Sequence, residues 1–280
     1  MANRTQGALT IENAYIGGSD MHGLMRRFVK SALAGFVMSS VVLSPYALAG
    51  EYDCGVLQNH GGIGPWDYYD PFSSAKTGED PMGRIKRVEN VHFKAGMRNL
   101  NTKEYDIDRL TSEITYTLSM FPNHPEALLA ITRLEKMAGG KLPQRSVDVY
   151  KPKISAYCFF DRALRFRPEQ PEVRFSYAIY LHQQGKYPEA LEHYKFAEKA
   201  FEENPFFQYN LGLLYSDMKN WPKATEYAER AYKWGAIFPG LRQRIEKAGY
   251  KLNLSGGNAS KSPEEKKADT ETQASEAASR

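Results

Sequence analysis

The chain has 280 residues, and 37 lysines and arginines stand against 33 aspartates and glutamates, a formal net charge of +4. This near balance argues against a nucleic-acid partner, which would require basic residues gathered on one face. Residues 1–49 hold four of the basic and two of the acidic residues, so the balance persists without them.

Residues 21–49 have the order of a secretory signal peptide. A basic region with Arg26 and Arg27 precedes an apolar stretch, and Ala47-Leu48-Ala49 fits the A-x-A cleavage pattern. The apolar stretch is short and interrupted by serines, so we expect cleavage before Gly50 and no integral membrane span afterwards. A retained N-terminal anchor is the alternative. The sequence therefore predicts export to the bacterial periplasm or cell envelope.

The first 20 residues precede this signal and are interpreted as an upstream extension. A secretory signal begins at its basic region, so residues 1–20 have no place in it. The true translation start is then expected at Met21 or Met25.

Residues 50–105 are expected to form an irregular N-terminal arm. Its most distinctive part is an aromatic run over residues 64–72. Pro65 and Pro71 near its two ends disfavour helix and predict an extended segment. We expect this run to pack on the protein's own helices, and a site for an outside ligand is the alternative. The aromatic side chains are Trp66, Tyr68, Tyr69 and Phe72.

The two cysteines that follow the signal, Cys54 and Cys158, are predicted to form a disulfide. An even number of cysteines in an oxidising compartment favours pairing. The bridge would close a loop of roughly 100 residues, which contributes about 4 kcal/mol in the chain-entropy model. Two buried free thiols are the alternative.

Helical spacing begins near residue 106. Leu110, Ile114 and Leu118 share one face of a helix that ends before Pro122. A helical hairpin follows, with its first helix from Pro125, its second over 155–164, and an insertion in 141–154 between them.

The next part of the chain repeats itself every 34 residues. Pro171, Pro205 and Pro239 are each 34 residues apart, and small residues recur in the same register. A period of this length predicts stacked helix pairs, in which small side chains let two helices approach closely. The matched small residues are Ala178 and Gly212, Ala190 and Ala224, and Ala197 and Ala231.

These repeats resemble the tetratricopeptide repeat family, whose pattern is W-x2-L-G-x2-Y followed by A-x3-F and P. Leu211-Gly212 with Tyr215 matches the first part. Arg174 and Gln208 replace the tryptophan, and Ala228 replaces the second aromatic residue. The resemblance implies an all-α solenoid of about three helix-turn-helix repeats over 106–253, with a leading and a closing helix. Residues 254–280 are polar and are expected to be a disordered tail.

The resemblance also implies a partner site, because the first helices of such repeats line a concave face. The side chains there are mostly apolar, so an apolar or aromatic peptide is the expected partner, with the aromatic arm as cover in its absence. The alternative is that these side chains belong to the hydrophobic core of the helix stack. The predicted face consists of Leu129, Arg133, Phe175, Ile179, His182, Phe206, Tyr209 and Leu213.

No pattern indicates catalysis, a metal or a cofactor. The six histidines lack the close spacings of metal sites, and the glycines at 61–64 lack the Lys-Ser/Thr of a phosphate loop. We therefore expect a non-catalytic adaptor or scaffold protein. The alternatives are a structural subunit of an envelope secretion or wall-assembly complex, and an enzyme that uses the repeats as scaffold.

Overall fold

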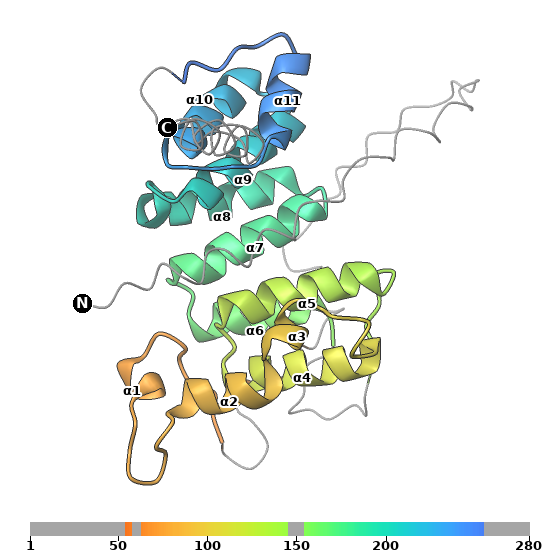
Figure 1. Cartoon of the computed structure of the whole chain (residues 1–280), viewed down its shortest axis with the longest axis vertical. Helices are drawn as coiled ribbons and strands as arrows, with labels where there is room; N and C mark the ends of the chain where they lie inside the picture. The colour runs from red at the N-terminus through yellow and green to blue at the C-terminus, as the bar shows by residue number, and fades with distance from the viewer. Residues whose placement is uncertain (1–53, 58–62, 145–153, 255–280) are drawn as a thin grey trace, which may run out of the picture. The chain divides into compact units, whose positions relative to one another are not determined.

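The computed structural model describes residues 54–57, 63–144 and 154–254. Within these ranges the protein is all α-helical, as predicted, and it divides into two compact units on either side of the Pro168–Glu169 junction (Figure 1). Both units contribute to the predicted repeat domain. The predicted upstream extension, signal peptide and cleavage site, and the tail beyond Leu254, lie outside the described residues. No helix in the described ranges is both long and apolar enough to cross a membrane.

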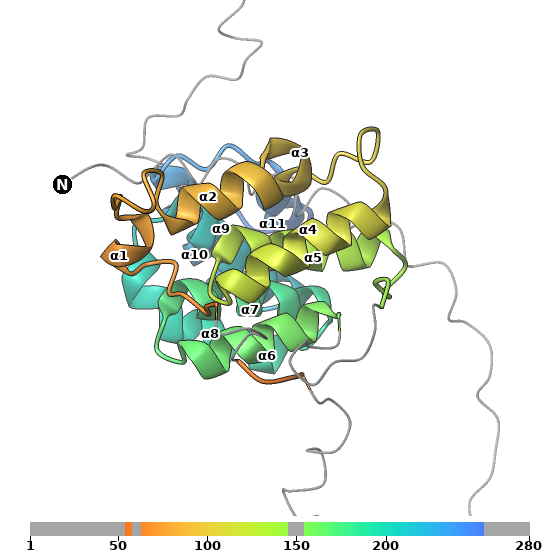
Figure 2. The same cartoon turned by 90° about the horizontal axis from the view of Figure 1, so that it is seen from below.

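The first unit contains the N-terminal arm, the leading helix and the first hairpin. Figure 2 shows α4 and α5 side by side, with α2 along one edge of this pair and α6 along the other. Leu110, Ile114 and Leu118 are fully buried on α4, as their spacing predicts. The helices are α1 (Pro71–Ser74), α2 (Arg84–His92), α3 (Ala95–Arg98), α4 (Ile107–Met120), α5 (Pro125–Met137) and α6 (Ala156–Phe166).

The arm is more regular than expected, because α1, α2 and α3 lie within residues 50–105. The nine-residue helix α2 places Ile85 and Val88 three residues apart on one face, and both pack in a cluster with Met120 and Phe121. This apolar pair is too short a pattern to predict a helix from sequence, and the contact with the end of α4 stabilises it.

The second unit consists of two helix pairs and a closing helix. In Figure 1, α7 lies against α8 and α9 lies against α10. Pro171 and Pro205 occupy the first positions of α7 and α9, where the missing N–H has no cost. The elements are α7 (Pro171–Gln183), α8 (Tyr187–Ala197), a 3-10 turn (Glu198–Phe201), α9 (Pro205–Asp217), α10 (Trp221–Lys233) and α11 (Gly240–Lys247).

The turn inside each hairpin has a left-handed residue at the same register position. Gly139 has φ +73°, Gly185 has φ +74°, and Lys219, 34 residues after Gly185, has φ +61°. Glycine is the residue that adopts this conformation without steric cost. Lys219 adopts it because the flanking helices fix the turn, so the repeat geometry prevails over local preference.

The predicted closing helix is α11, in which Leu241 and Ile245 are fully buried. It ends at Lys247. Gly249 has φ +85°, a left-handed conformation that terminates the helix.

The tightest helix crossing of the second unit is at Gly212 in α9. A Cβ atom there would lie 2.6 Å from Cδ2 of Leu241 and 3.5 Å from both the carbonyl oxygen of Ala224 and the backbone nitrogen of Ala228. The glycine therefore lets α9 contact both α10 and α11, which is the role that its place in the 34-residue register predicts.

We predict that Gly212→Leu lowers the free energy of unfolding by roughly 1–3 kcal/mol, because the new side chain must displace Leu241 and separate α9 from α10. Denaturant unfolding measures this change. Lys219→Ala is the control: its side chain lies in an exposed turn, and we expect a change of less than about 0.5 kcal/mol. Equal effects from the two variants would contradict the assigned crossing.

Candidate protein-interaction site

Most of the predicted concave-face residues are buried side chains that join helices. Within the second unit, Phe175 has its ring centroid 5.8 Å from that of Phe206 and 4.9 Å from that of Phe207. Tyr209 packs on Phe238 and accepts a 3.3 Å hydrogen bond from the backbone N–H of Leu241. The exposed fractions are 7% for Phe175, 1% for Ile179, 3% for His182, 7% for Tyr209 and 1% for Leu213.

Phe206 differs from these five residues because it is only half-buried. It lies in the first turn of α9, where its ring contacts Phe175 and keeps part of its own surface accessible. It is therefore the predicted aromatic residue of this face that retains the most surface for contact with another molecule.

A chain of charged and polar side chains crosses the three helices α7, α9 and α11. Nε2 of His182 lies 2.9 Å from Oδ2 of Asp217, and Nη1 of Arg244 donates a 2.8 Å hydrogen bond to Oδ1 of the same carboxylate. Burial alone would raise the pKa of Asp217, but the hydrogen bond from His182 and the charge of Arg244 outweigh it and lower the pKa. The ionised carboxylate thus holds the three helices together.

Sequence reasoning missed Asp217 and Arg244. Asp217 directly follows Ser216, the residue 34 positions after His182, so the repeat register places it beside the predicted face. Arg244 is 34 positions after Asn210. Comparing positions 34 residues apart could therefore have pointed to both residues. The search by apolar spacing missed them because both are charged.

The two predicted face residues of the first unit also serve packing. Leu129 is buried. Nη2 of Arg133 donates a 2.8 Å hydrogen bond to the carbonyl oxygen of Arg98, the last residue of α3. Arg133 thus satisfies a free carbonyl group at a helix C-terminus.

The aromatic arm has its partners within the first unit. The ring centroid of Trp66 lies 5.7 Å from that of Phe121, and the backbone N–H of Trp66 donates a hydrogen bond to the carbonyl oxygen of Met120. Tyr68 stacks on His124 at 4.2 Å. These contacts place the arm on the ends of α4 and α5, which differs from the groove environment that we expected near Phe175, Tyr209 and Leu213.

The other two aromatic residues of the arm contribute less. Tyr69 packs edge-on against the ring of Tyr68, and Phe72 in α1 keeps 75% of its surface exposed. Phe72 therefore lacks the burial that we predicted for it.

Polar contacts fix the position of the arm. Asp67 accepts hydrogen bonds from Asn123 at 2.7 Å and from Arg167 at 2.7 Å. The Tyr68 hydroxyl donates a 3.0 Å bond to Glu89, and Nε2 of the fully buried His124 lies 3.2 Å from the same carboxylate oxygen. Burial would raise the pKa of Glu89, but the bonds from His124 and Tyr68 lower it.

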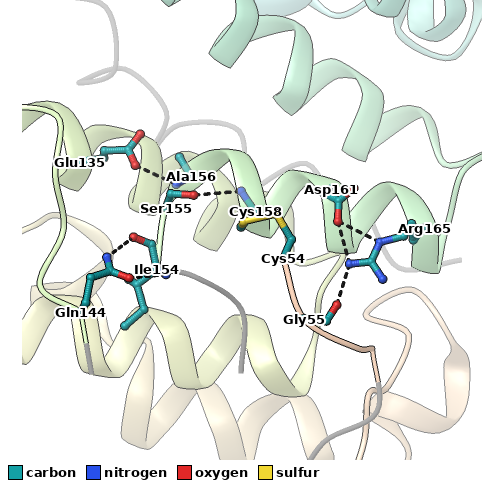
Figure 3. The surroundings of a disulfide bond; sticks show 10 residues. All are labelled: Cys54, Gly55, Glu135, Gln144, Ile154, Ser155, Ala156, Cys158, Asp161 and Arg165. Carbon is teal, nitrogen blue, oxygen red and sulfur yellow. Dashed lines mark hydrogen bonds and ion pairs between the residues drawn. A yellow bond between two sulfur atoms is a disulfide. The ribbon is translucent and has the colours of Figure 1, made fainter. Parts of the chain in front are cut away.

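The predicted disulfide is confirmed. Cys54 is bonded to Cys158 in α6, and both residues are buried. Figure 3 shows the segment of Cys54 beside α6, where the carbonyl oxygen of Gly55 accepts a 2.9 Å bond from Arg165. The described residues contain no group of three or more potential metal-binding side chains.

The helix pairs agree with a comparison against protein-family models. Residues 180–219, which include the end of α7, all of α8 and α9, and the turn after α9, match the model described as TPR repeat. This part of the chain is therefore similar to a tetratricopeptide repeat. A search of curated proteins gave no match. Tetratricopeptide repeats generally mediate protein–protein contacts and lack catalytic activity of their own.

We predict that Asp217→Asn lowers the free energy of unfolding at neutral pH by roughly 1–3 kcal/mol, the range for hydrogen bonds to a charged group. Because the folded-state pKa of Asp217 is lowered, its contribution is complete above the unfolded pKa of about 3.9 and is lost as the pH falls through the folded value. Chemical unfolding at pH 7 and below pH 4 tests both statements.

Glu189→Gln is the matched control, because Glu189 forms only an exposed 4.0 Å pair with Lys186. It should change stability by less than about 0.5 kcal/mol. If Asp217→Asn is as mild as this control, the chain of contacts between His182, Asp217 and Arg244 does not stabilise the unit.

Proposed function

We propose that this protein is a non-catalytic adaptor or scaffold of the bacterial periplasm or cell envelope, and that it binds a partner protein or peptide through the first helices of its repeats. The single observation that supports this most is the TPR repeat over residues 180–219. The disulfide is compatible with an oxidising compartment.

Phe206 is the residue that we propose at the centre of the contact. It combines a partly exposed aromatic ring with a rigid base, because its ring contacts the buried Phe175, which packs in turn on the buried Phe207. Aromatic residues on rigid supports contribute disproportionately to protein interfaces. An apolar or aromatic segment of the partner would extend this cluster.

A structural subunit of an envelope secretion or wall-assembly complex is the second candidate. The burial of six of the eight predicted face residues supports it, because buried side chains serve the stack itself. A complex that survives purification at fixed stoichiometry would favour the subunit, and a partner that dissociates during purification would favour the adaptor.

We predict that a photo-crosslinking amino acid at position 206 captures the partner in intact cells, and that Phe206→Ala weakens binding of that purified partner at least tenfold. Position 196 is the matched control, because Phe196 is a more exposed aromatic residue (51%) on the second helix α8. Equal capture at both positions, or equal affinity of Phe206→Ala and Phe196→Ala, would exclude α9 as the contact.

We also predict that Ala49→Phe blocks removal of residues 21–49, because the peptidase accepts only small side chains at the end of an A-x-A site. N-terminal sequencing of protein from the native host should find Gly50 first in the parent chain and an uncleaved chain in the variant. Leu48→Phe, at the unrestricted middle position, should still be processed. A parent protein that keeps residues 21–49 would contradict cleavage, and its recovery from the cytosol would contradict export too.

A further inference from the structure

Arg162 in α6 is a buried cation without a hydrogen-bonding partner. It keeps 1% of its surface exposed, and none of its three guanidinium nitrogens forms a hydrogen bond among the described residues. Burial, together with the charge of Arg165, lowers the pKa of Arg162 to about 10, so the group is a cation at neutral pH. An uncompensated buried charge is strongly destabilising.

The repeat architecture does not require a buried arginine at this position. The residues 34 and 68 positions later are Phe196, which is 51% exposed, and Arg230, which is on the surface and paired with Glu226. The other arginines near the end of α6 have acceptors: Arg165 binds Asp161, and Arg167 binds Asp67. Arg162 therefore differs from its equivalents and from its neighbours.

Cys158 lies one helical turn before Arg162. Residues four apart are neighbours on a helix surface, and Cys158 is the third residue of α6 after its N-cap Ser155. The first turn of a helix and a nearby arginine favour a thiolate over the thiol, whereas the burial of Cys158 opposes a thiolate. The free-energy cost of removing Arg162 from water is already present in the oxidised protein. A thiolate at Cys158 would therefore be attracted by this cation without adding that cost again.

The other charged groups near Cys158 are the carboxylate of Glu135 and the ion pair of Asp161 with Arg165. Glu135 of α5 accepts a 3.0 Å bond from the N–H of Ala156 and opposes a thiolate, but burial raises its pKa and so disfavours its own charge. Asp161 is already paired with Arg165 (Figure 3). The charge of Asp161 also acts on Arg162 and raises its pKa, but the guanidinium group of Arg162 forms no hydrogen bond to an anion among the described residues.

We propose that the Cys54–Cys158 disulfide is a reducible switch, in which reduction produces a Cys158 thiolate paired with Arg162 and removes the covalent link between the segment of Cys54 and α6. The hydrogen bond from Arg165 to the carbonyl oxygen of Gly55 also joins this segment to α6. The contacts of Asp67 and Tyr68 hold the following part of the arm and do not depend on the disulfide.

The reducing partner is a dithiol. Its thiolate attacks Sγ of Cys54 and forms a mixed disulfide, while the Cys54–Cys158 bond breaks and its electron pair stays on Cys158. The second thiol loses its proton and closes the dithiol's own disulfide, which releases Cys54 as a protonated thiol. Two electrons pass to the protein. Because Cys158 stays deprotonated, one proton is released to solvent, and the equilibrium shifts toward reduced protein as the pH rises.

The test equilibrates the full chain with mixtures of reduced and oxidised dithiothreitol, traps the free thiols by alkylation and quantifies them by mass. We expect Arg162→Gln to require at least a tenfold higher ratio of reduced to oxidised reagent for half-reduction, a change of about 30 mV for this two-electron couple. Arg162→Lys keeps the charge and should behave like the parent chain.

A second measurement does not depend on the stability of Arg162→Gln. In Cys54→Ser the single thiol of Cys158 is titrated by its ultraviolet absorbance, and its pKa should lie below the value of about 8.5 for a free cysteine. A value at or above 8.5 would overturn the proposal. So would half-reduction of the parent chain and Arg162→Gln at the same ratio, or a parent reduction equilibrium that does not change with pH.

Discussion

The second unit depends on the close approach of three helices at Gly212. A side chain at this position would meet Leu241 of α11 on one side and the backbone of α10 on the other, so the absence of a Cβ sets the distance of both helices from α9. Dense packing follows from this distance, because Leu213 and Ile245 are then removed from water almost completely. The hydrogen bond from Leu241 to Tyr209 and the contact of Arg244 with Asp217 require α11 to be at this distance.

The elements of the first unit are held together by polar contacts in addition to apolar packing. Within its N-terminal arm, Asp67 joins the segment before α1 to the turn before α5 and to the end of α6. His124 has two functions there, since its Nδ1 accepts from the N–H of Ala127 as the N-cap of α5 and its Nε2 contacts Glu89. Because both ring nitrogens of the buried His124 have partners, this side chain gives the arm one defined position.

The helices and the disulfide could be predicted because they follow from local rules. Period, proline position and apolar spacing are properties of neighbouring residues, and the pairing of Cys54 with Cys158 is predicted from their even number and the expected oxidising compartment. The contacts of the arm could not be predicted in this way. An aromatic residue such as Trp66 can pack on any apolar surface, and the choice of Phe121 depends on where α2 and α4 meet. For the same reason, the helical positions of Phe175 and Leu213 could be assigned from sequence, but their burial depends on side chains far along the chain.

The copy that departs most from the repeat pattern also carries the most unusual chemistry. The first hairpin contains the insertion, the disulfide and the buried Arg162, whereas the second unit follows the 34-residue register with ordinary surface residues at the equivalent positions. A regular repeat leaves the outer side of its second helix to solvent, as the exposure of Phe196 illustrates. In the first hairpin the segment of Cys54 is attached to that helix instead, and Arg162 of the same helix is buried. A charge that would cost little on the surface costs more when it is buried, and a thiolate at Cys158, four residues earlier on the same helix, is the anion that we propose to compensate it.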